Sequence, residues 1–155
     1  MDTANIVITG AGIVCAMGCN LKEVAESLRR QRSGVGRMRF LQSAHQELPV
    51  GEVAMDTADM KHRLHIDPSR EVSRTALMGM MAVGEALANA HLQPTDGLRV
   101  LLVSGTTVAG MDITENHYAS MAEGGDASCL LQHDCGASSQ LIADHFGLFS
   151  DVATI

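Results

Sequence analysis

The sequence predicts an α/β fold in which helices flank a mixed, mostly parallel sheet. Apolar, β-branched runs alternate along the chain with segments of helical periodicity, and two of these runs open into glycine-rich turns. Strands that alternate with helices in this way are typical of parallel sheets built from crossover units. With 155 residues, 46% of them hydrophobic, the chain is long enough for one domain with a real core.

The first predicted strand is the run from Asn5 to Thr9, which leads into Gly10-Ala11-Gly12. A short β-branched run before a tight glycine turn is the pattern of a buried strand. A dinucleotide-binding turn would place a third glycine where Cys15 stands, and an acidic residue at the end of the next strand. Neither is present, so a nicotinamide or flavin site stays a minor alternative.

The next element is a helix that begins after Asn20, a good N-cap with Glu23 three residues further on. Its apolar face is expected to consist of Leu21, Val24, Ala25 and Leu28. Ser33 to Gly36 ends it. Residues 37–66 are predicted to be irregular, with one or two short strands and with His45, His62 and His65 in solvent.

A long helix is predicted over residues 71–91, with Asp67 or Ser69 as its N-cap. Its apolar positions run nearly all the way round, which is typical of a helix buried on most sides. Gly79 and Gly84 lower its intrinsic helix propensity. We expect them to permit close packing against another helix or a partner.

A turn at 94–97 precedes the strongest strand, residues 98–104, whose apolar run predicts cover on both faces. The loop 105–110 then stands where α/β sheets bind ligands. A helix over 111–121 and an apolar link at 129–131 follow. The helix over 136–146 ends at Gly147, and a last strand runs to Ile155.

The composition excludes several classes of function. A net charge of −7 argues against nucleic-acid binding, which needs clustered basic side chains. The one basic cluster, within residues 29–39, lies at a predicted helix C-terminus, where the helix dipole favours it. The sequence shows no signal peptide and no membrane span, so we expect a cytoplasmic protein.

Four cysteines are present, at positions 15, 19, 129 and 135, without Cys-x-x-Cys spacing. In a reducing compartment they are expected to be buried thiols. Zinc bound by Cys129, His133 and Cys135 is disfavoured, because no fourth ligand has matching spacing. We therefore predict no metal and no cofactor.

Taken in order, several short motifs resemble the N-terminal half of the β-ketoacyl-acyl carrier protein synthases, which are condensing enzymes with a thiolase-like fold. The resemblance covers essentially the whole chain as one domain, 1–155. Its motifs are residues 6–12 with Gly18, Ser33 to Gly36, the helix from Arg74 to Leu92, Ser104-Gly105, Glu115 to His117, and His145 to Leu148.

The resemblance implies that the chain ends one or two residues before the family's nucleophilic cysteine. The other two catalytic groups would belong to the C-terminal half, so no catalytic residue is assigned here and the fragment alone is expected to be inactive. The implied partners are acyl carrier protein, carrying acyl or malonyl thioesters in fatty acid or polyketide synthesis, and a second copy of the chain.

The resemblance also places Thr106, Thr107, Cys129 and Leu130 along the acyl-chain channel, the last two across a dimer interface. The chain departs from the family's commoner pattern there, because Thr106-Thr107 replaces a glycine and an aliphatic residue and Cys129 replaces a frequent aromatic. These departures suggest an altered acyl preference. The alternatives to a catalytic subunit are a non-catalytic partner like a chain-length factor and, less favoured, a nucleotide-binding module.

Overall fold

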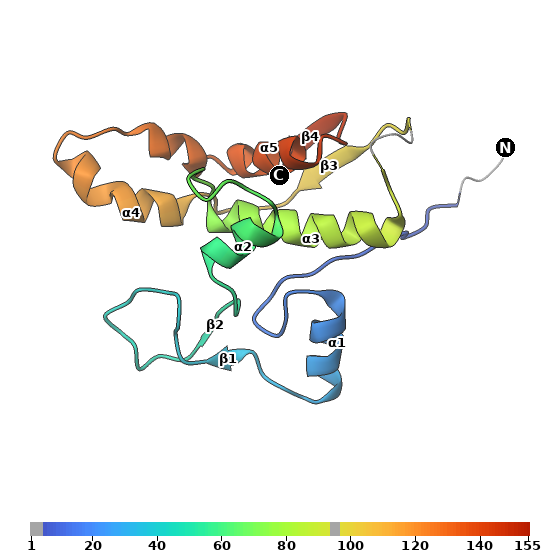
Figure 1. Cartoon of the computed structure of the whole chain (residues 1–155), viewed down its shortest axis with the longest axis horizontal. Helices are drawn as coiled ribbons and strands as arrows, with labels where there is room; N and C mark the ends of the chain where they lie inside the picture. Colours follow the sequence, from blue (N-terminus) through green and yellow to red (C-terminus); the bar gives the residue numbers. More distant parts are fainter. Residues whose placement is uncertain (1–4, 94–96) are drawn as a thin grey trace.

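The structure is a computed structural model that describes residues 5–93 and 97–155 (Figure 1). The described residues combine helices with two small sheets, which confirms the predicted α/β class. The elements in chain order are α1 (Leu21–Arg29), β1 (Val35–Gly36), β2 (Val50–Gly51), α2 (Thr57–Arg63), α3 (Arg74–Ala90), β3 (Leu101–Ser104), α4 (Met111–Ala122), the 3₁₀ helix η2 (Ser128–His133), α5 (Cys135–Phe146) and β4 (Asp151–Thr154).

One sheet consists of β3 and β4, which run parallel, with Leu101 opposite Asp151 and Ser104 opposite Thr154. The predicted parallel pairing is thus confirmed, although the strand begins three residues later than expected. The other sheet pairs β1 with β2 in antiparallel fashion. It supplies the short strand expected within residues 37–66.

The hydrophobic core gathers around α3, which lies between α2 and α5 (Figure 1). Methionine contributes much of it, since Met60 and Met80 are fully buried beside Leu77. The prediction for the two helix glycines is also confirmed. A Cβ at Gly79 would lie 2.5 Å from Ile142 Cδ1 on α5, and Gly84 faces Phe146 on the same helix.

Of the two predicted helix N-caps, that of α1 is confirmed and that of α3 is wrong. Asn20 Oδ1 accepts the Glu23 N–H at 2.9 Å, which confirms the predicted cap of α1. The cap of α3 is Ser73, whereas Asp67 holds Ser69 in a local turn through a 2.8 Å bond. Because Asp67 and Ser69 bond to each other in this turn, neither residue caps α3, and the helix starts later than predicted.

Helix α2 was not expected, because the sequence from 37 to 66 reads as irregular. Its N-cap is Asp56, which accepts the Asp59 N–H at 2.7 Å. The seven residues of α2 are too few to show a clear helical period, and its one buried side chain is Met60. His45, His62 and His65 are exposed, as predicted.

The strand predicted at Asn5 to Thr9 is wrong for this structure. These residues form no strand pairing, and Ile6 and Ile8 are almost wholly exposed. A strand needs a neighbour for its backbone N–H and C=O groups, and β3 and β4 pair with each other instead. The prediction that β3 is covered on both faces is wrong as well, since Leu101 and Val103 are each 55% exposed.

The glycines after this segment serve helix packing. A Cβ at Gly10 or Gly12 would collide with backbone atoms of α3 around Ala82, Ala86 and Ala90. Side chains of α3 complete the attachment, because Glu85 accepts the N–H groups of Ile13 and Leu21, and Asn89 donates to Ala11 O. This packing accounts for the glycines without a bound nucleotide.

The side chains that α1 buries differ from the predicted apolar face. Val24 is buried, but Leu21 is partly exposed and Leu28 is mostly exposed, while the polar Ser27 is fully buried. The apolar positions of α1 are therefore not all covered by the described residues. Ser27 instead donates to Met17 O at 2.7 Å, which fixes α1 to the segment before it.

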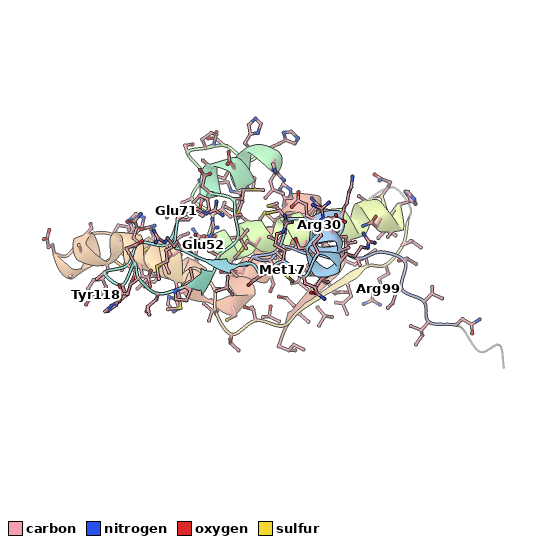
Figure 2. The ribbon with its side chains drawn as sticks, turned by 90° about the horizontal axis from the view of Figure 1, so that it is seen from below. Met17, Arg30, Glu52, Glu71, Arg99 and Tyr118 are labelled. Carbon is pink, nitrogen blue, oxygen red and sulfur yellow. The ribbon has the colours of Figure 1, made fainter. Side chains whose placement is uncertain are left out.

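The molecule is elongated, and Tyr118 on α4 and Arg99 beside β3 lie toward opposite ends of it (Figure 2). Most of the turn predicted at 94–97 lies outside the described residues; Gly97 has a positive φ of 64°. Among the residues that the structure describes, no helix has the length and apolar character needed to cross a membrane.

Candidate functional site

The candidate site lies at the carboxyl ends of β3 and β4. The two strands are parallel, so their last residues meet at one edge of the sheet, where α/β proteins place their ligand-binding loops. Ile155 N donates to Ser104 O at 2.9 Å, and Thr106 N donates to Ile155 O at 3.3 Å. The loop that carries Thr106 and Thr107 is therefore joined to the end of β4.

The two threonines differ in their surroundings. Thr106 is half-buried, and its Oγ1 donates to Val108 O at 2.8 Å and accepts the Val108 N–H at 3.3 Å. Its hydroxyl therefore holds the loop in shape. Thr107 is exposed, so its side chain is accessible to a ligand.

The second predicted pair, Cys129 and Leu130, lies in η2. Cys129 is only 6% exposed, and its Sγ lies 3.4 Å from Met121 Sδ on α4. Leu130 is 47% exposed. The structure thus directs Cys129 into the contact with α4 and leaves Leu130 at the surface.

Gly110 brings the two segments together. A Cβ at this position would overlap Gln132 O of η2, and its φ of 57° is in the left-handed region. Only glycine combines this conformation with so close an approach at no steric cost. The loop after β3 and η2 are therefore packed on each other, although the predicted residues themselves face different surroundings.

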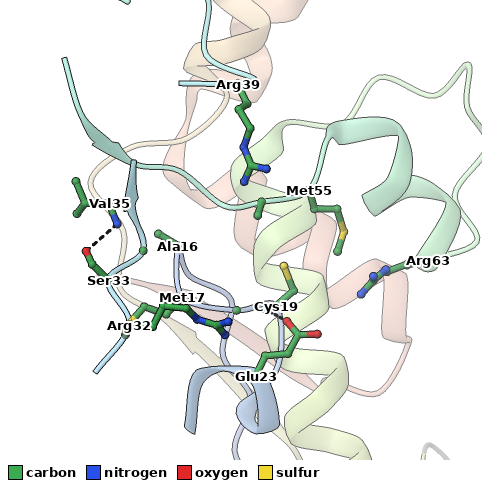
Figure 3. Close-up of a pocket in the computed structure, with 13 residues that line it drawn as sticks. Ala16, Met17, Cys19, Glu23, Arg32, Ser33, Val35, Arg39, Met55 and Arg63 are labelled. Carbon is green, nitrogen blue, oxygen red and sulfur yellow. Dashed lines mark hydrogen bonds between the residues drawn. The ribbon is translucent and has the colours of Figure 1, made fainter. Parts of the chain in front are cut away.

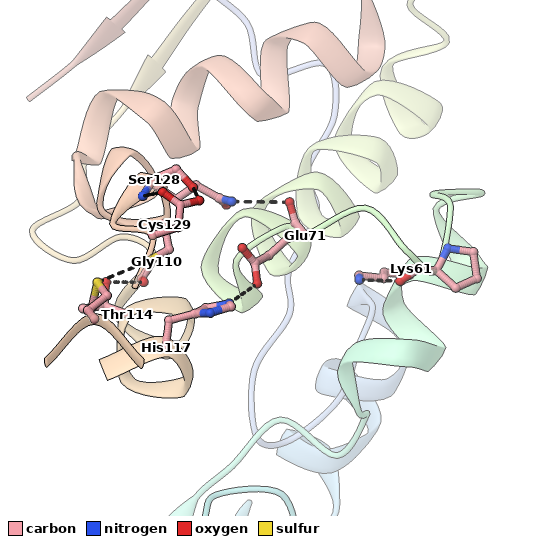
Figure 4. A network of polar contacts seen from close by, with 11 residues as sticks. Lys61, Glu71, Gly110, Thr114, His117, Ser128 and Cys129 are labelled. Carbon is pink, nitrogen blue, oxygen red and sulfur yellow. Dashed lines mark hydrogen bonds and ion pairs between the residues drawn. The ribbon is translucent and has the colours of Figure 1, made fainter. Parts of the chain in front are cut away.

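A polar network holds α4 and η2 in this position (Figure 4). His117 Nε2 lies 2.7 Å from Glu71 Oε1, and Gln132 Nε2 donates to Glu71 O at 3.4 Å. Thr114 Oγ1 lies 3.1 Å from His133 Nδ1. Sequence reasoning missed this network, because Glu71 is 46 residues from His117 and no local pattern links them.

Helix α5 is fixed to β4 by a bond of 2.7 Å from Thr154 Oγ1 to Ser139 Oγ. Two buried polar atoms, Ser138 Oγ and Gln132 Oε1, have no hydrogen-bond partner in the described part of the chain. Leaving such a group unpaired costs about 1–3 kcal/mol. Gln132 lies in η2 and Ser138 lies in α5.

The four cysteines are free thiols, of which Cys129 is buried and the other three are half-buried. Burial raises the pKa of the Cys19 thiol, and the nearby Glu23 carboxylate raises it further. Cys129 faces Met121 and His133 contacts Thr114, so these two do not converge with Cys135 on a metal position. Over residues 5–93 and 97–155, no three His, Cys, Asp or Glu side chains are grouped to hold a metal ion.

Comparisons with known proteins agree on one family. The family model described as Beta-ketoacyl synthase, N-terminal domain, matches residues 3–151. The chain is 34% identical over 104 residues to 3-oxoacyl-[acyl-carrier-protein] synthase 1 of Escherichia coli strain K12, with the same figures for the protein of strain O6:H1. The match covers 64% of this chain and 25% of the relative, so the chain spans about a quarter of the relative's length.

Two solved structures have a similar fold. The ishigamide ketosynthase/chain length factor superposes with a TM-score of 0.76 at 22% identity, covering 96% of this chain and 39% of that one. A β-ketoacyl synthase from Burkholderia phymatum STM815 gives a TM-score of 0.66 at 18% identity, covering 95% and 38%. The thiolase-like architecture predicted from the sequence is thereby confirmed.

Proposed function

Because the chain belongs to the β-ketoacyl synthase family, we propose that it is the N-terminal part of a transferase that extends an acyl chain on acyl carrier protein. The observation that carries this proposal is the match of the family's N-terminal domain over residues 3–151. The proposed reaction condenses an acyl thioester with malonyl-acyl carrier protein and releases carbon dioxide. It would serve fatty acid or polyketide synthesis.

The proposed chemistry needs several groups that act together. Acyl transfer requires a thiolate with a lowered pKa, and condensation requires donors that stabilise an oxyanion and an enolate. Burial raises the pKa of Cys19, and Cys129 is packed against Met121. We therefore propose that the 155-residue chain by itself does not catalyse the reaction.

Acylation measures this directly. The 155-residue chain is incubated with a radiolabelled acyl-acyl carrier protein and then separated under denaturing conditions. We expect no covalent label. Stable label on this chain would overturn the proposal that it is inactive alone, whereas the family's activity is tested separately by 3-oxoacyl product formation with the intact gene product.

The proposed substrate contacts are Thr106, Thr107, Cys129 and Leu130. Support comes from the position of the threonine loop at the carboxyl ends of β3 and β4 and from the packing of Gly110 on η2. The exposed Leu130 is better placed to meet an acyl chain or a second subunit than Cys129, which lies under α4.

The Thr106→Ile variant of the intact synthase tests the proposed acyl preference. The variant loses the hydroxyl that bonds to Val108 and adds apolar bulk at the loop. We expect a changed distribution of acyl chain lengths in the products. The Thr75→Ile variant on α3 is a matched control, and an unchanged chain-length profile in the Thr106 variant would contradict the assignment.

We further propose that the chain forms a dimer. We also propose a cytoplasmic location, which rests on the sequence analysis alone. The exposed Leu101 and Val103 on β3 and the exposed Ile155 after β4 support an interface at this sheet. Size-exclusion chromatography with light scattering is expected to give a dimer. A monodisperse monomer at micromolar concentration would argue against the interface.

A second candidate is a non-catalytic subunit of the chain-length-factor kind. The observation in its favour is the fold match to a solved ketosynthase/chain length factor. The gene sequence distinguishes the catalytic from the non-catalytic hypothesis. A cysteine encoded within a few codons after Ile155 supports the enzyme, and another residue at that place supports the non-catalytic partner.

A further inference from the structure

A pocket of about 470 Å³ lies between α1, the β1–β2 region and α2, on the other side of α3 from β3 and β4 (Figures 1 and 3). Its polar lining includes Arg32, Arg39, Arg63 and Glu23, while Met17 and Met55 supply apolar wall. It is separate from the loop of Thr106 and Thr107. The proposed condensation chemistry therefore leaves this pocket without a role.

The guanidinium groups of Arg32, Arg39 and Arg63 reach into the pocket from three sides (Figure 3). Among the described residues, none of the three forms an ion pair: Arg32 donates to Ser27 Oγ, and Arg39 lies over the Phe40 ring. Glu23 is the one carboxylate in the lining, so three positive charges face one negative charge. This net charge of +2 stands in a chain whose total is −7.

The negative charge in the lining is already engaged. Glu23 Oε2 accepts the Cys19 N–H at 2.8 Å. This hydrogen bond is the main reason why the pKa of Glu23 lies below its ordinary value. Arg63 and Arg32 lower the pKa further through their positive charge, and Figure 3 shows both side chains on the pocket that Glu23 lines. The carboxylate stays ionised at neutral pH and offsets only one of the three arginines.

Partly buried contacts hold the pocket wall in place. Arg32 Nη2 donates to Ser27 Oγ at 2.8 Å, and the fully buried Ser27 donates to Met17 O at 2.7 Å. On the same side, a Cβ at Gly34 would lie 2.6 Å from the Ala16 carbonyl carbon, so the two loops touch. Arg32 is thus oriented before any ligand arrives, which reduces the entropy lost on binding.

We propose that this pocket binds the phosphate group of a small phosphate ester. Arginine forks match phosphate oxygens bidentately, and a phosphate monoester carries close to two negative charges at neutral pH, which equals the surplus charge of the lining. The volume lies within the range of about 300–1,000 Å³ typical of pockets for small organic molecules. The methionines at the wall suit the organic part of the ester.

Binding of glycerol 3-phosphate and inorganic phosphate to the 155-residue chain is measured by isothermal titration calorimetry, with succinate as a dianion of different shape. We expect both phosphates to bind and succinate to bind at least about tenfold more weakly, since it lacks the tetrahedral oxygens. Binding of inorganic phosphate as tight as that of the ester means a site for the free ion, which overturns the ester assignment. Equal binding of succinate overturns the phosphate assignment.

The matched variants are Arg39→Gln with Arg63→Gln in one protein, and Arg70→Gln, which removes an exposed arginine outside the pocket lining, as the control. The pocket variant is expected to lose about tenfold or more in affinity for each arginine, the size of a hydrogen bond between charged groups. The control should change less than about twofold. Equal affinity of the two variants would refute the site.

A measurement on the unaltered protein keeps the test independent of how the variants fold. Cys19 lines the pocket, whereas Cys135 begins α5 and is not part of the lining. Bound glycerol 3-phosphate should slow alkylation of Cys19 by iodoacetamide, measured by peptide mass spectrometry, and leave Cys135 unchanged. No protection of Cys19 at a saturating ester concentration would overturn the proposal.

Discussion

A single methyl group at Gly12 should detach the N-terminal segment from α3. In the Gly12→Ala variant the new Cβ would lie 2.9 Å from both Ala82 C and Ala86 N, and closer still to the Ala82 carbonyl oxygen. These are backbone atoms in the middle of a helix, so no side-chain rotation relieves the overlap. The segment itself has to move away.

The required movement sets the size of the effect. Nonbonded carbon atoms rest about 3.5–4.0 Å apart, so the segment must withdraw by at least about 0.6 Å from Ala82 C, and by more from the Ala82 carbonyl oxygen, which is closer. Withdrawal strains the bonds of 3.0 Å from Ile13 N to Glu85 Oε2 and 2.8 Å from Asn89 Nδ2 to Ala11 O. Overpacking costs about 1–3 kcal/mol, and a weakened bond to a charged group adds to it. We expect a loss of about 3 kcal/mol in the free energy of unfolding.

Urea unfolding followed by circular dichroism measures this loss, and hydrogen exchange at Ile13 and Leu21 reports local detachment. The control is Gly36→Ala, because a Cβ at Gly36 meets no atom within 4 Å. The control should stay within about 0.5 kcal/mol of the parent protein. If Gly12→Ala unfolds at the same urea concentration as the control, with unchanged exchange at Ile13 and Leu21, the packing argument fails.

Three further changes should alter stability. Burial lowers the pKa of His145, so the unfolded chain binds the proton more readily than the folded chain. The free energy of unfolding should therefore fall as the pH drops below about 6.5. The urea midpoints at about pH 7.5 and pH 5.5 should differ less in the His145→Asn variant than in the parent protein. The Asn20→Ala variant removes the cap of α1 and should cost about 1 kcal/mol, while Asn20→Asp should restore it; equal midpoints for both variants would contradict the cap. The Arg74→Gln variant loses bonds of 3.1 and 2.8 Å to two loop carbonyls and its place over the Phe40 ring, so thermal unfolding should show a loss of about 1–3 kcal/mol, and an unchanged melting temperature would show that the loop does not depend on it.

Local signals predicted the helices best. Asn20 before a polar first turn, and Gly147 after an amphipathic segment, mark the ends of α1 and α5 through the backbone groups that they satisfy or the φ angle that they allow. Gly79 and Gly84 predicted close helix packing, because a glycine inside a helix has a cost that packing can offset. Helix α2 was not predicted, because its seven residues are too few to show a clear helical period of apolar side chains.

The candidate site was predicted less completely. The loop of Thr106 and Thr107 follows from the position of β3 in the chain, and the structure joins it to the end of β4. The burial of Cys129 under Met121 and the bond between Glu71 and His117 could not be read from the sequence, since their partners are 8 and 46 residues away. The arginine pocket was likewise hidden, because Arg32 and Arg39 looked like side chains favoured by a helix dipole and Arg63 stands apart from them in sequence.

The sequence by itself determined the class of fold, the start of α1, the end of α5 and the family, because these depend on periodicity, on caps and on short motifs in a fixed order. Only the tertiary structure decided which apolar runs are paired and which polar groups meet. Ile6 to Ile8 has the composition of a buried strand, yet these residues are exposed, because a strand needs a neighbour and composition does not supply one. Burial and charge surplus are properties of the packed surroundings, so the exposure of Leu101 and Val103 on β3 and the arginine pocket became visible only in the tertiary structure.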